Sequence, residues 1–359
     1  MKEKWLLRNK KEEFQSLSKY MKENSLILRL LANRGISKKE SASLFLNGTI
    51  NDMYDGSLLK DLNKGVAIIK DAIEKGKKIV IYGDYDCDGV CSTAIFYKAL
   101  KRLNANFSYH IPNRESEGYG MNLERIKILK NQGAEVLLTC DNGIAAFDEV
   151  QYAKDIGLSV VITDHHDIPF VEKDGIKTEI MPNADAIINP KRKDCIYPFK
   201  NLCGAGVAFK FVQILYKEFK IDIKESFELL EFASIATVCD VVDLLDENRI
   251  IVKKGLELIN STKNKGLKEL IKVKKIDGKE ISEYHFGFVI GPCINATGRL
   301  EIADISLELL ITEDEERAKE LAIKLNELNE KRQELTVEST EKVIEKVEND
   351  LKDDEKVIF

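Results

Sequence analysis

Three aspartates, Asp84, Asp86 and Asp88, alternate within the segment Gly83–Gly89, directly after a short apolar run. A fold that held these carboxylates together would need a cation between them, because like charges repel. A calcium loop of the EF-hand type would continue to a Glu at its twelfth position, whereas an apolar, helix-like segment at 93–103 follows here. The remaining alternative is an acidic turn without a ligand. We interpret the alternation as a divalent-cation site at the end of a strand.

Three further polar clusters also follow short apolar runs. Asp141 lies in an Asp-Asn-Gly sequence, which on its own is an ordinary turn. The next run ends in Asp164, His165 and His166, and an Asp beside His is typical of a metal ligand and the carboxylate that orients it. Asn189 follows another run. These clusters therefore share one property: each lies directly after an apolar run that is long enough to be a strand.

A further carboxylate, Asp240, lies in the apolar segment 231–244. A buried carboxylate is costly unless it is paired or coordinated, so a metal would compensate it. Five carboxylates with one imidazole form an oxygen-rich site, which suits Mn²⁺ or Mg²⁺ better than Zn²⁺ or copper. The expected ligands, enough for two ions, are Asp84, Asp86, Asp88, Asp141, His165 and Asp240, with Asp84 either a ligand or a neighbour of one. Two such ions hydrolyse phosphate esters, so the residues predict a two-metal phosphoesterase.

The segments that would position these residues alternate between strands and helices. Short β-branched runs predict strands at 78–82, 106–110, 135–139, 159–163 and 185–188. Such alternation is typical of an α/β fold with a doubly wound parallel sheet and helices on both faces. The carboxyl ends of parallel strands share the edge where ligands bind, so we expect the clusters to converge there.

Three regions divide the chain of 359 residues. We expect a helical lead-in at 1–66 and the α/β catalytic domain, with a helical insert, at 67–310. A long connector helix, opened by a capping box at Thr312, is expected within 311–359. The last residues, 355–359, read as the start of a buried strand with nothing after it, from which we expect a truncated chain.

Composition excludes several classes of protein. Apolar residues make up 44% and charged residues 32%, which excludes collagen-like and disordered chains. No apolar run approaches the ~20 residues of a membrane span, and seven Cys without a CxxC pair argue against a disulfide framework, so we expect a cytoplasmic protein. Residues 301–359 hold 19 acidic and 9 basic residues, which leaves 46 basic against 42 acidic residues in the body. That balance is compatible with a polyanionic ligand.

These motifs resemble the DHH phosphoesterase family, and within it the exonucleases specific for single-stranded DNA. The matching segments are GDYDCDG at 83–89, DNG at 141–143, DHH at 164–166, residues 236–243 around Asp240, and GPCINATGR at 291–299. The similarity extends from Asn33 to Arg332 and covers almost the whole chain. The resemblance implies 5′→3′ hydrolysis of single-stranded DNA to 5′ mononucleotides, in DNA repair and recombination, by a monomer with two Mn²⁺ or Mg²⁺ ions. A single-strand-binding protein or a helicase would be its partner.

The resemblance also implies roles for single residues. Asp141 would bridge the two ions, His166 would face the scissile phosphate, and Asp164 would orient its neighbours. Arg114 would bind a 5′ phosphate and Tyr119 would stack on a terminal base, in keeping with guanidinium and aromatic chemistry. Further substrate contacts are expected at Asn189, Asn295 and Arg299.

Two departures from the family pattern stand out. Cys293 occupies a position where the family commonly has Arg, which removes one cation near the site, and residues 300–359 lack the Gly-rich, His-containing loop of the family's second lobe. Two alternatives remain: a DHH phosphodiesterase for small substrates such as nanoRNA or cyclic dinucleotides, and a non-catalytic replication scaffold. The segment 113–120 argues against the first, and the full set of carboxylates argues against the second.

Overall fold

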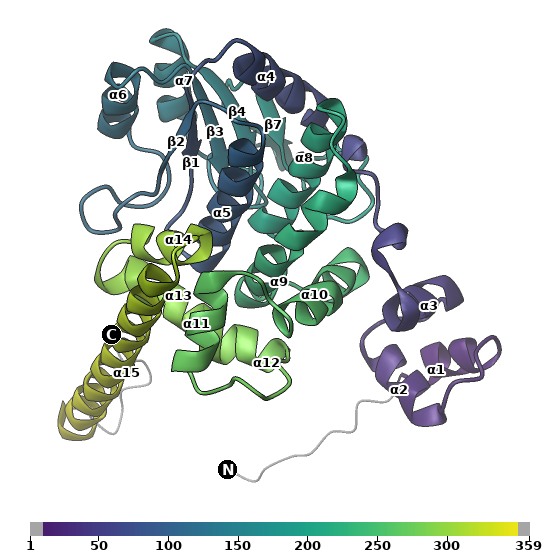
Figure 1. Ribbon diagram of the computed structural model, residues 1–359. Coiled ribbons are helices and arrows are strands. Elements are labelled where there is room, and N and C mark those ends of the chain that lie inside the picture. Colours follow the sequence, from purple (N-terminus) through teal and green to yellow (C-terminus); the bar gives the residue numbers. More distant parts are fainter. Residues whose placement is uncertain (1–9, 351–359) are drawn as a thin grey trace.

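A five-stranded parallel sheet forms the centre of the computed structural model, which describes residues 10–350 (Figure 1). The strand order is β2-β1-β3-β4-β7, from β1 (Ile79–Tyr82), β2 (Phe107–His110), β3 (Val136–Cys140), β4 (Ser159–Thr163) and β7 (Ala186–Ile188). All four neighbouring pairs are parallel. Each strand lies within one residue of its expected range, because fully buried parallel strands read as continuous β-branched runs. The doubly wound α/β fold is confirmed.

Helices cover both faces of the sheet. One face carries α4 (Leu62–Glu74), α5 (Cys87–Arg102) and α8 (Gly204–Glu218), and the other carries α6 (Leu123–Asn131) and α7 (Phe147–Asp155). Successive strand side chains point to opposite faces. Ile79 and Ile81 of β1 therefore belong to the first core, while Val80 and Tyr82 belong to the second.

The topological switch point of the sheet lies at β1. The chain passes from β1 to β2 on one side and then to β3 on the other, so the loops after β1 and β3 diverge. In open α/β sheets this divergence leaves the crevice in which ligands bind. The loops after β1 and β3 are those that contain Asp84 and Asp141.

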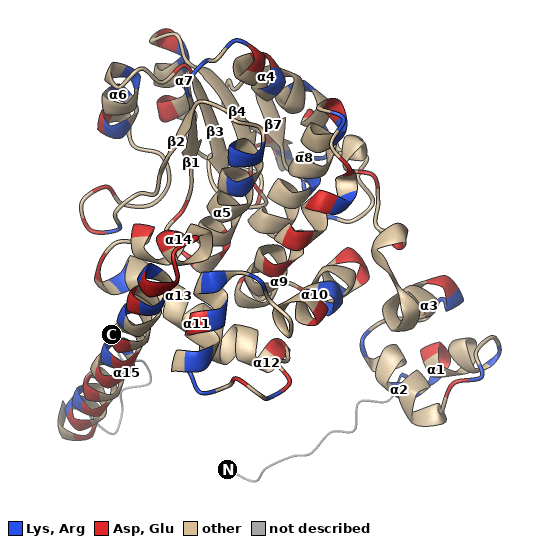
Figure 2. Cartoon of the chain, viewed as in Figure 1, with Lys and Arg blue, Asp and Glu red and all other residues tan. Residues whose placement is uncertain are grey.

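A helical layer packs beside the sheet and corresponds to the helical insert expected within 67–310. It contains η3 (Ile223–Leu229), α9 (Leu230–Cys239), α10 (Asp246–Ile259), α11 (Lys265–Val273), α12 (Glu283–His285), the π-helical turn η4 (Phe286–Ile290), α13 (Gly291–Leu300) and α14 (Asp304–Ile311). The connector helix α15 (Glu315–Asp350) packs against α11 and α13, and charges of both signs lie along it (Figure 2). Its cap differs from the expected one: Asp314 Oδ1, and not Thr312, accepts a hydrogen bond from the Arg317 backbone at 2.8 Å.

The lead-in has a small core of its own. It consists of α1 (Lys11–Ser18), α2 (Ser25–Asn33) and α3 (Lys39–Asn47), followed by η1 (Ile50–Asp52) and η2 (Gly56–Leu58). Arg249 of α10 lies over the Phe45 ring, 3.8 Å from its centroid, and connects α3 to the helical layer. The boundary expected after residue 66 falls inside α4, whose apolar face packs on β7 and α8. That helix therefore belongs with the sheet.

Three smaller points complete the fold. An exposed antiparallel hairpin, β5 (Phe170–Lys173) and β6 (Ile176–Glu179), follows the DHH segment and was not expected from the sequence. The strand expected at 355–359 lies outside the described residues. None of the helices that the structure describes combines the length and apolar composition that a membrane span requires.

Candidate metal centre

Ligand atoms from four separate segments converge at the carboxyl edge of the sheet. They form sets whose atoms all lie within 4.8 Å of one another: Asp84, Asp86 and Asp141; Asp88, His165 and Asp240; and Asp141, His165 and His166. The first two sets divide the six expected ligands into two groups of three. Asp141 of the first group also forms the third set with His165 of the second group and His166. Its carboxylate therefore lies between the two groups, where a bridging ligand is expected.

Several of these buried atoms have no hydrogen-bond partner among the described residues. They are Oδ1 of Asp84, Oδ1 of Asp141, Nε2 of His165 and Oδ2 of Asp240. His165 Nε2 lies 3.0 Å from Asp141 Oδ1 without hydrogen-bond geometry, and its Nδ1 lies 3.7 Å from Asp240 Oδ2. Buried polar atoms almost always have a partner, so unpartnered atoms that face one another fit a divalent cation.

Burial and mutual repulsion raise the pKa values of these carboxyl groups. Desolvation, followed by the charge of Asp86, raises the pKa of Asp84 to about 7. Desolvation and then Asp88 raise the pKa of Asp240 to about 7, and the same causes raise the pKa of Asp141 well above its usual range. Near neutral pH the cluster is therefore balanced either by protons or by a cation, which would favour the ionised forms.

Asp88 differs from its neighbours because backbone donors hold both its oxygens. The amides of Gly204 and Ala205, at the N-terminus of α8, donate to it at 2.6 and 2.7 Å. Gly204 leaves room for Asp141 as well: a Cβ at this position would lie 2.7 Å from Asp141 Cβ. The sequence analysis missed Gly204. Its signal is the Gly-Ala-Gly that opens a helix, a pattern that favours anionic groups at helix N-termini.

Two amide side chains tie the metal loops together. Asn142 donates to the carbonyl oxygens of Tyr82 and Gly83 at 3.2 and 2.9 Å and so joins the loop after β3 to the loop after β1. Asn295 Oδ1 accepts from the Cys87 backbone at 2.8 Å. Asn295, expected as a substrate contact, therefore uses its oxygen to hold the start of α5.

Asp164 and His166 form a hydrogen-bonded pair at the rim of the centre. Asp164 Oδ1 lies 2.7 Å from His166 Nδ1, and its other oxygen accepts from the Ile144 backbone at 2.9 Å. Burial alone would raise the pKa of Asp164, but the hydrogen bond and charge of His166 lower it below its usual value. The same bond raises the pKa of His166 to about 9, so this half-exposed imidazole is cationic at neutral pH.

An aromatic and basic group adjoins His166. The Tyr119 hydroxyl lies 3.2 Å from His166 Nε2, and the Tyr119 and Tyr85 ring centroids are 6.3 Å apart. The Arg114 guanidinium lies 5.8 Å from the Tyr85 ring centroid. Arg299 is exposed on α13, whose Gly298 packs so closely on Tyr85 that a Cβ would lie 2.4 Å from the Tyr85 carbonyl oxygen. Arg114, Tyr119 and Arg299 thus lie on one flank of the metal centre, as expected.

The loop that contains Arg114 and Tyr119 is fixed by a charged network. Glu117 lies 2.8 Å from His110 Nε2 and 2.6 Å from Arg125. Glu117 lies seven residues along the chain from His110, so this network is local and its role is structural.

Two expectations differ from the structure. Asn189 was expected to contact substrate, but its side chain is fully buried, with Nδ2 bonded to the His166 carbonyl at 2.9 Å and Oδ1 to the Lys191 backbone at 2.9 Å. It positions the DHH segment instead. Cys293 was expected near the site, yet it is buried, and the charges that act on its thiol are those of Lys274, Arg332 and Glu330.

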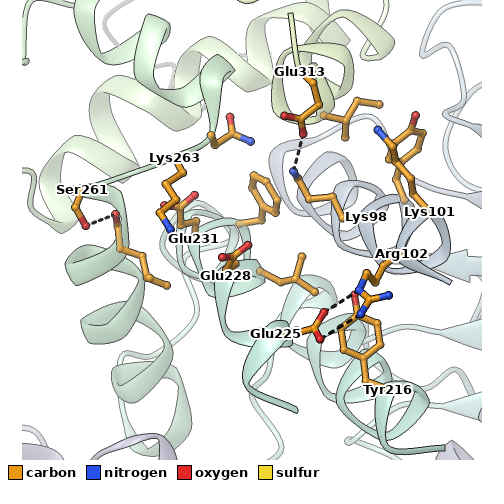
Figure 3. Close-up of a pocket in the computed structure, with 16 residues that line it drawn as sticks. Lys98, Lys101, Arg102, Tyr216, Glu225, Glu228, Glu231, Ser261, Lys263 and Glu313 are labelled. Carbon is orange, nitrogen blue, oxygen red and sulfur yellow. Dashed lines mark hydrogen bonds and ion pairs between the residues drawn. The ribbon is translucent and has the colours of Figure 1, made fainter. Parts of the chain in front are cut away.

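A separate cavity of about 600 Å³ lies between the far half of α5, η3 and α9 (Figure 3). Two ion pairs lie within it: Lys98 is 3.8 Å from Glu313, and Arg102 is 2.8 Å from Glu225. None of the expected site residues lines it. Lys98 is ten residues beyond Asp88, roughly 15 Å along the helix. The metal centre, and not this cavity, is therefore the candidate active site.

A doubly wound sheet with a cluster of candidate metal ligands at its carboxyl edge defines the class of this chain. The model of the DHH family, N-terminal domain, matches residues 78–237. The chain belongs to the DHH family, and the resemblance inferred from the motifs is confirmed.

Relatives and solved structures within this family point to one group. The chain is 42% identical to the single-stranded-DNA-specific exonuclease RecJ of Bacillus subtilis, over 94% of this chain and 41% of the relative. It is 34% identical to RecJ of Escherichia coli, over 86% of this chain and 53% of the relative. A crystal structure of exonuclease RecJ bound to manganese matches with a TM-score of 0.71 and 32% identity, over 80% of this chain and 70% of that one. The chain spans about half the length, or less, of these two curated relatives.

Proposed function

We propose that this chain holds the catalytic centre of an exonuclease that hydrolyses phosphodiester bonds of single-stranded DNA. The observation that carries the proposal is the division of six candidate ligands into two adjoining groups of three. Their oxygen-rich chemistry suits Mn²⁺ or Mg²⁺, the ions bound in the structures of RecJ from Thermus thermophilus. When bound, two such ions supply an activated water and stabilise the leaving oxygen.

The protein's own groups would orient the phosphate. His166 is cationic and fixed by Asp164 through Nδ1, so its Nε2–H is free to donate to a phosphate oxygen in place of the Tyr119 hydroxyl. A preorganised, charged donor of this kind stabilises the negative charge that develops in the transition state. Arg299, exposed on the same flank, adds a second cation for the substrate.

A 5′→3′ direction follows if the first nucleotide occupies the flank of Arg114, Tyr85 and Tyr119. The guanidinium is suited to a terminal phosphate, and the exposed Tyr119 ring is suited to an unpaired base. Cleavage at the metal centre would then release one 5′ mononucleotide at a time. Such an activity belongs to DNA repair and recombination, where single strands are resected.

The substitution Asp141→Ala tests the metal centre. Hydrolysis of a 5′-labelled oligonucleotide with Mn²⁺ should fall by roughly 10²-fold or more, because the carboxylate that lies between the two groups of ligands is lost. The exposed Asp167→Ala, whose side chain forms an ion pair with Lys191, is the matched control and should retain activity. A variant Asp141→Ala that keeps more than about a tenth of the rate would remove Asp141 from the centre.

The substitution Arg114→Ala tests the direction. The wild-type chain should prefer 5′-phosphorylated to 5′-hydroxyl oligomers, and the variant should lose that preference without losing the chemistry. Arg29→Ala, in the lead-in helix α2, is the control. An unchanged preference would contradict the assignment of this flank to the 5′ end. Rapid cleavage of dinucleotides with none of longer strands would favour the small-substrate alternative.

A further inference from the structure

Two exposed aromatic rings stack on each other at the π-helical turn. Tyr284 and Phe288 are 60% and 69% exposed, and their ring centroids lie 4.9 Å apart with an interplanar angle of 24°. Single exposed apolar residues are ordinary, but a stacked pair with open faces is a ready platform for another flat ring. The pair lies where α12 passes into η4, and π-helical turns occur frequently at functional sites.

This turn packs directly on the segment that ends in a metal ligand. The Cys239 thiol donates to the Phe286 carbonyl at 3.4 Å, and a Cβ at Gly287 would lie 3.4 Å from Val238. Cys239 immediately precedes Asp240. The π-helical turn η4 contacts α12, α13 and α9, and α13 reaches the metal loop through Asn295. The turn that carries the aromatic pair therefore packs on the end of the helix that leads to Asp240.

The residue after Asp240 is strained. Val241 has a φ of 58° and is 87% exposed, and a β-branched residue in this left-handed conformation is a genuine outlier of the kind that clusters at functional sites. Val241, Lys191 and Asn201 line a cavity of about 400 Å³ together with His165 and Asp240.

That cavity makes a second flank of the metal centre. Tyr85, Arg114 and Tyr119 do not line it, so it is distinct from the flank proposed for the 5′ end. Lys191 contributes a cation there, because its only ion pair within the described residues is with Asp167, whose side chain is 93% exposed, and such surface pairs contribute little. A strand that crosses the metal centre from Arg114 would leave over Lys191 and Val241.

We propose that Tyr284 and Phe288 form a stacking platform for unpaired bases on the 3′ side of the scissile phosphate. The inference rests on the proposed function in one respect, that a strand crosses the metal centre. Aromatic faces accept any base, because every base has a π-face, so the platform would hold the strand without selecting sequence. The basic residues of α11, visible in Figure 2, lie on the segment that precedes it and would attract the backbone.

The double variant Tyr284→Ala/Phe288→Ala tests the platform in the full chain. With 5′-phosphorylated oligothymidylate of about 12 nucleotides and Mn²⁺, KM should rise roughly 5-fold to 100-fold while kcat is unchanged. With a dinucleotide, which is too short to reach the platform, both constants should match the wild type. Phe288→Trp keeps a stacking face and should keep the wild-type KM. Tyr20→Ala, which removes a ring that is 63% exposed in the lead-in, is the matched control.

A fluorescent base separates this proposal from the proposed function. Without metal, 2-aminopurine placed several nucleotides from the 5′ end of the bound oligomer should be quenched by the wild type and not by the double variant, while quenching at the first nucleotide should persist in both. An unchanged KM and unchanged quenching in the double variant overturn the platform. If the wild type cuts no strand but the quenching pattern holds, the platform stands and the exonuclease proposal falls.

Discussion

Two neighbouring aspartates, both 1% exposed, should respond in opposite directions to the same substitution. Asp84 has a buried oxygen without a partner, and Asp164 is bonded to His166 and to backbone amides. In the metal-free protein we expect Asp84→Asn to stabilise the fold and Asp164→Asn to destabilise it. The comparison isolates hydrogen bonding, because burial and side-chain size are the same.

The magnitude follows from the pKa of Asp84. Its value of about 7 in the folded protein exceeds the usual 3.8, so the folded state favours the protonated form. The contribution of Asp84 to the free energy of unfolding is fully present below pH 3.8, its pKa in the unfolded chain, because both states are then protonated. This contribution is lost as the pH rises through 7, the pKa in the folded protein. A shift of about three units corresponds to roughly 4 kcal/mol in the free energy of unfolding. Asp84→Asn should recover up to that amount at alkaline pH and almost none near pH 4.

The stability contribution of Asp164 changes with pH in the opposite direction, because its pKa is lowered in the folded state. Its contribution is present above the unfolded value and is lost as the pH falls through the folded value. Asp164→Asn should therefore cost about 1 to 3 kcal/mol at alkaline pH, since it weakens the partner of a buried donor.

Urea denaturation with a chelator, at pH about 4 and about 8, measures both effects as changes in the free energy of unfolding. Excess Mn²⁺ should then stabilise the wild type, by about 2.7 kcal/mol at one hundred times Kd, and should stabilise Asp84→Asn less. The reasoning fails if Asp84→Asn is as destabilising as Asp164→Asn in the metal-free protein at pH about 8. The reasoning also fails if the stability of Asp84→Asn relative to the wild type is the same at both pH values.

Three further predictions address other parts of the site and the fold. Gly204→Ala should lower Mn²⁺ affinity, measured by calorimetry, with the far-ultraviolet circular dichroism unchanged, because the new Cβ would lie 2.7 Å from Asp141 Cβ. Asp164→Asn should move the alkaline limb of the kcat/KM profile from about pH 9 toward 6.5, since His166 loses the bond that raises its pKa; an unmoved limb would show that His166 does not set it. Lys210→Met should cost roughly 3 to 5 kcal/mol in urea denaturation, because it leaves a buried carboxylate unpaired, and a loss below about 1 kcal/mol would contradict this.

The central sheet was predictable because its information is local. Strands β1, β3, β4 and β7 are short, largely buried apolar runs, and β2 is a half-buried run with two aromatic residues. The order of the strands in the sheet was not predicted. The candidate metal ligands were identified for a similar reason, since each lies shortly after a strand or at the end of an apolar helix, and their role stays a prediction. The hairpin at 170–179 was missed because its strands are exposed on both faces and have no apolar alternation to mark them.

Features that depend on long-range pairing could not be predicted in this way. Lys210 and Glu247 form an ion pair with no solvent exposure, and Glu247 also accepts from the Tyr197 hydroxyl and the Tyr54 backbone. Nothing local marks either charge as buried, because the pairing joins residues 37 positions apart. A lysine in an apolar helix reads as an exposed residue until its partner is known.

The same limit explains why the carboxylates of the site look alike in the sequence but are not equivalent. Asp88 is fixed by two amides that lie 116 and 117 residues away, so its carboxylate is in place without a metal. Asp84 and Asp141 each retain an unpartnered oxygen, so their orientation depends on what balances their charge. We infer that Asp88 is the preorganised part of the centre and that the other two carboxylates order around the ions. Loss of the hydrogen bond from the Gly204 backbone N–H to Asp88 should therefore impair metal binding even though no ligand is changed.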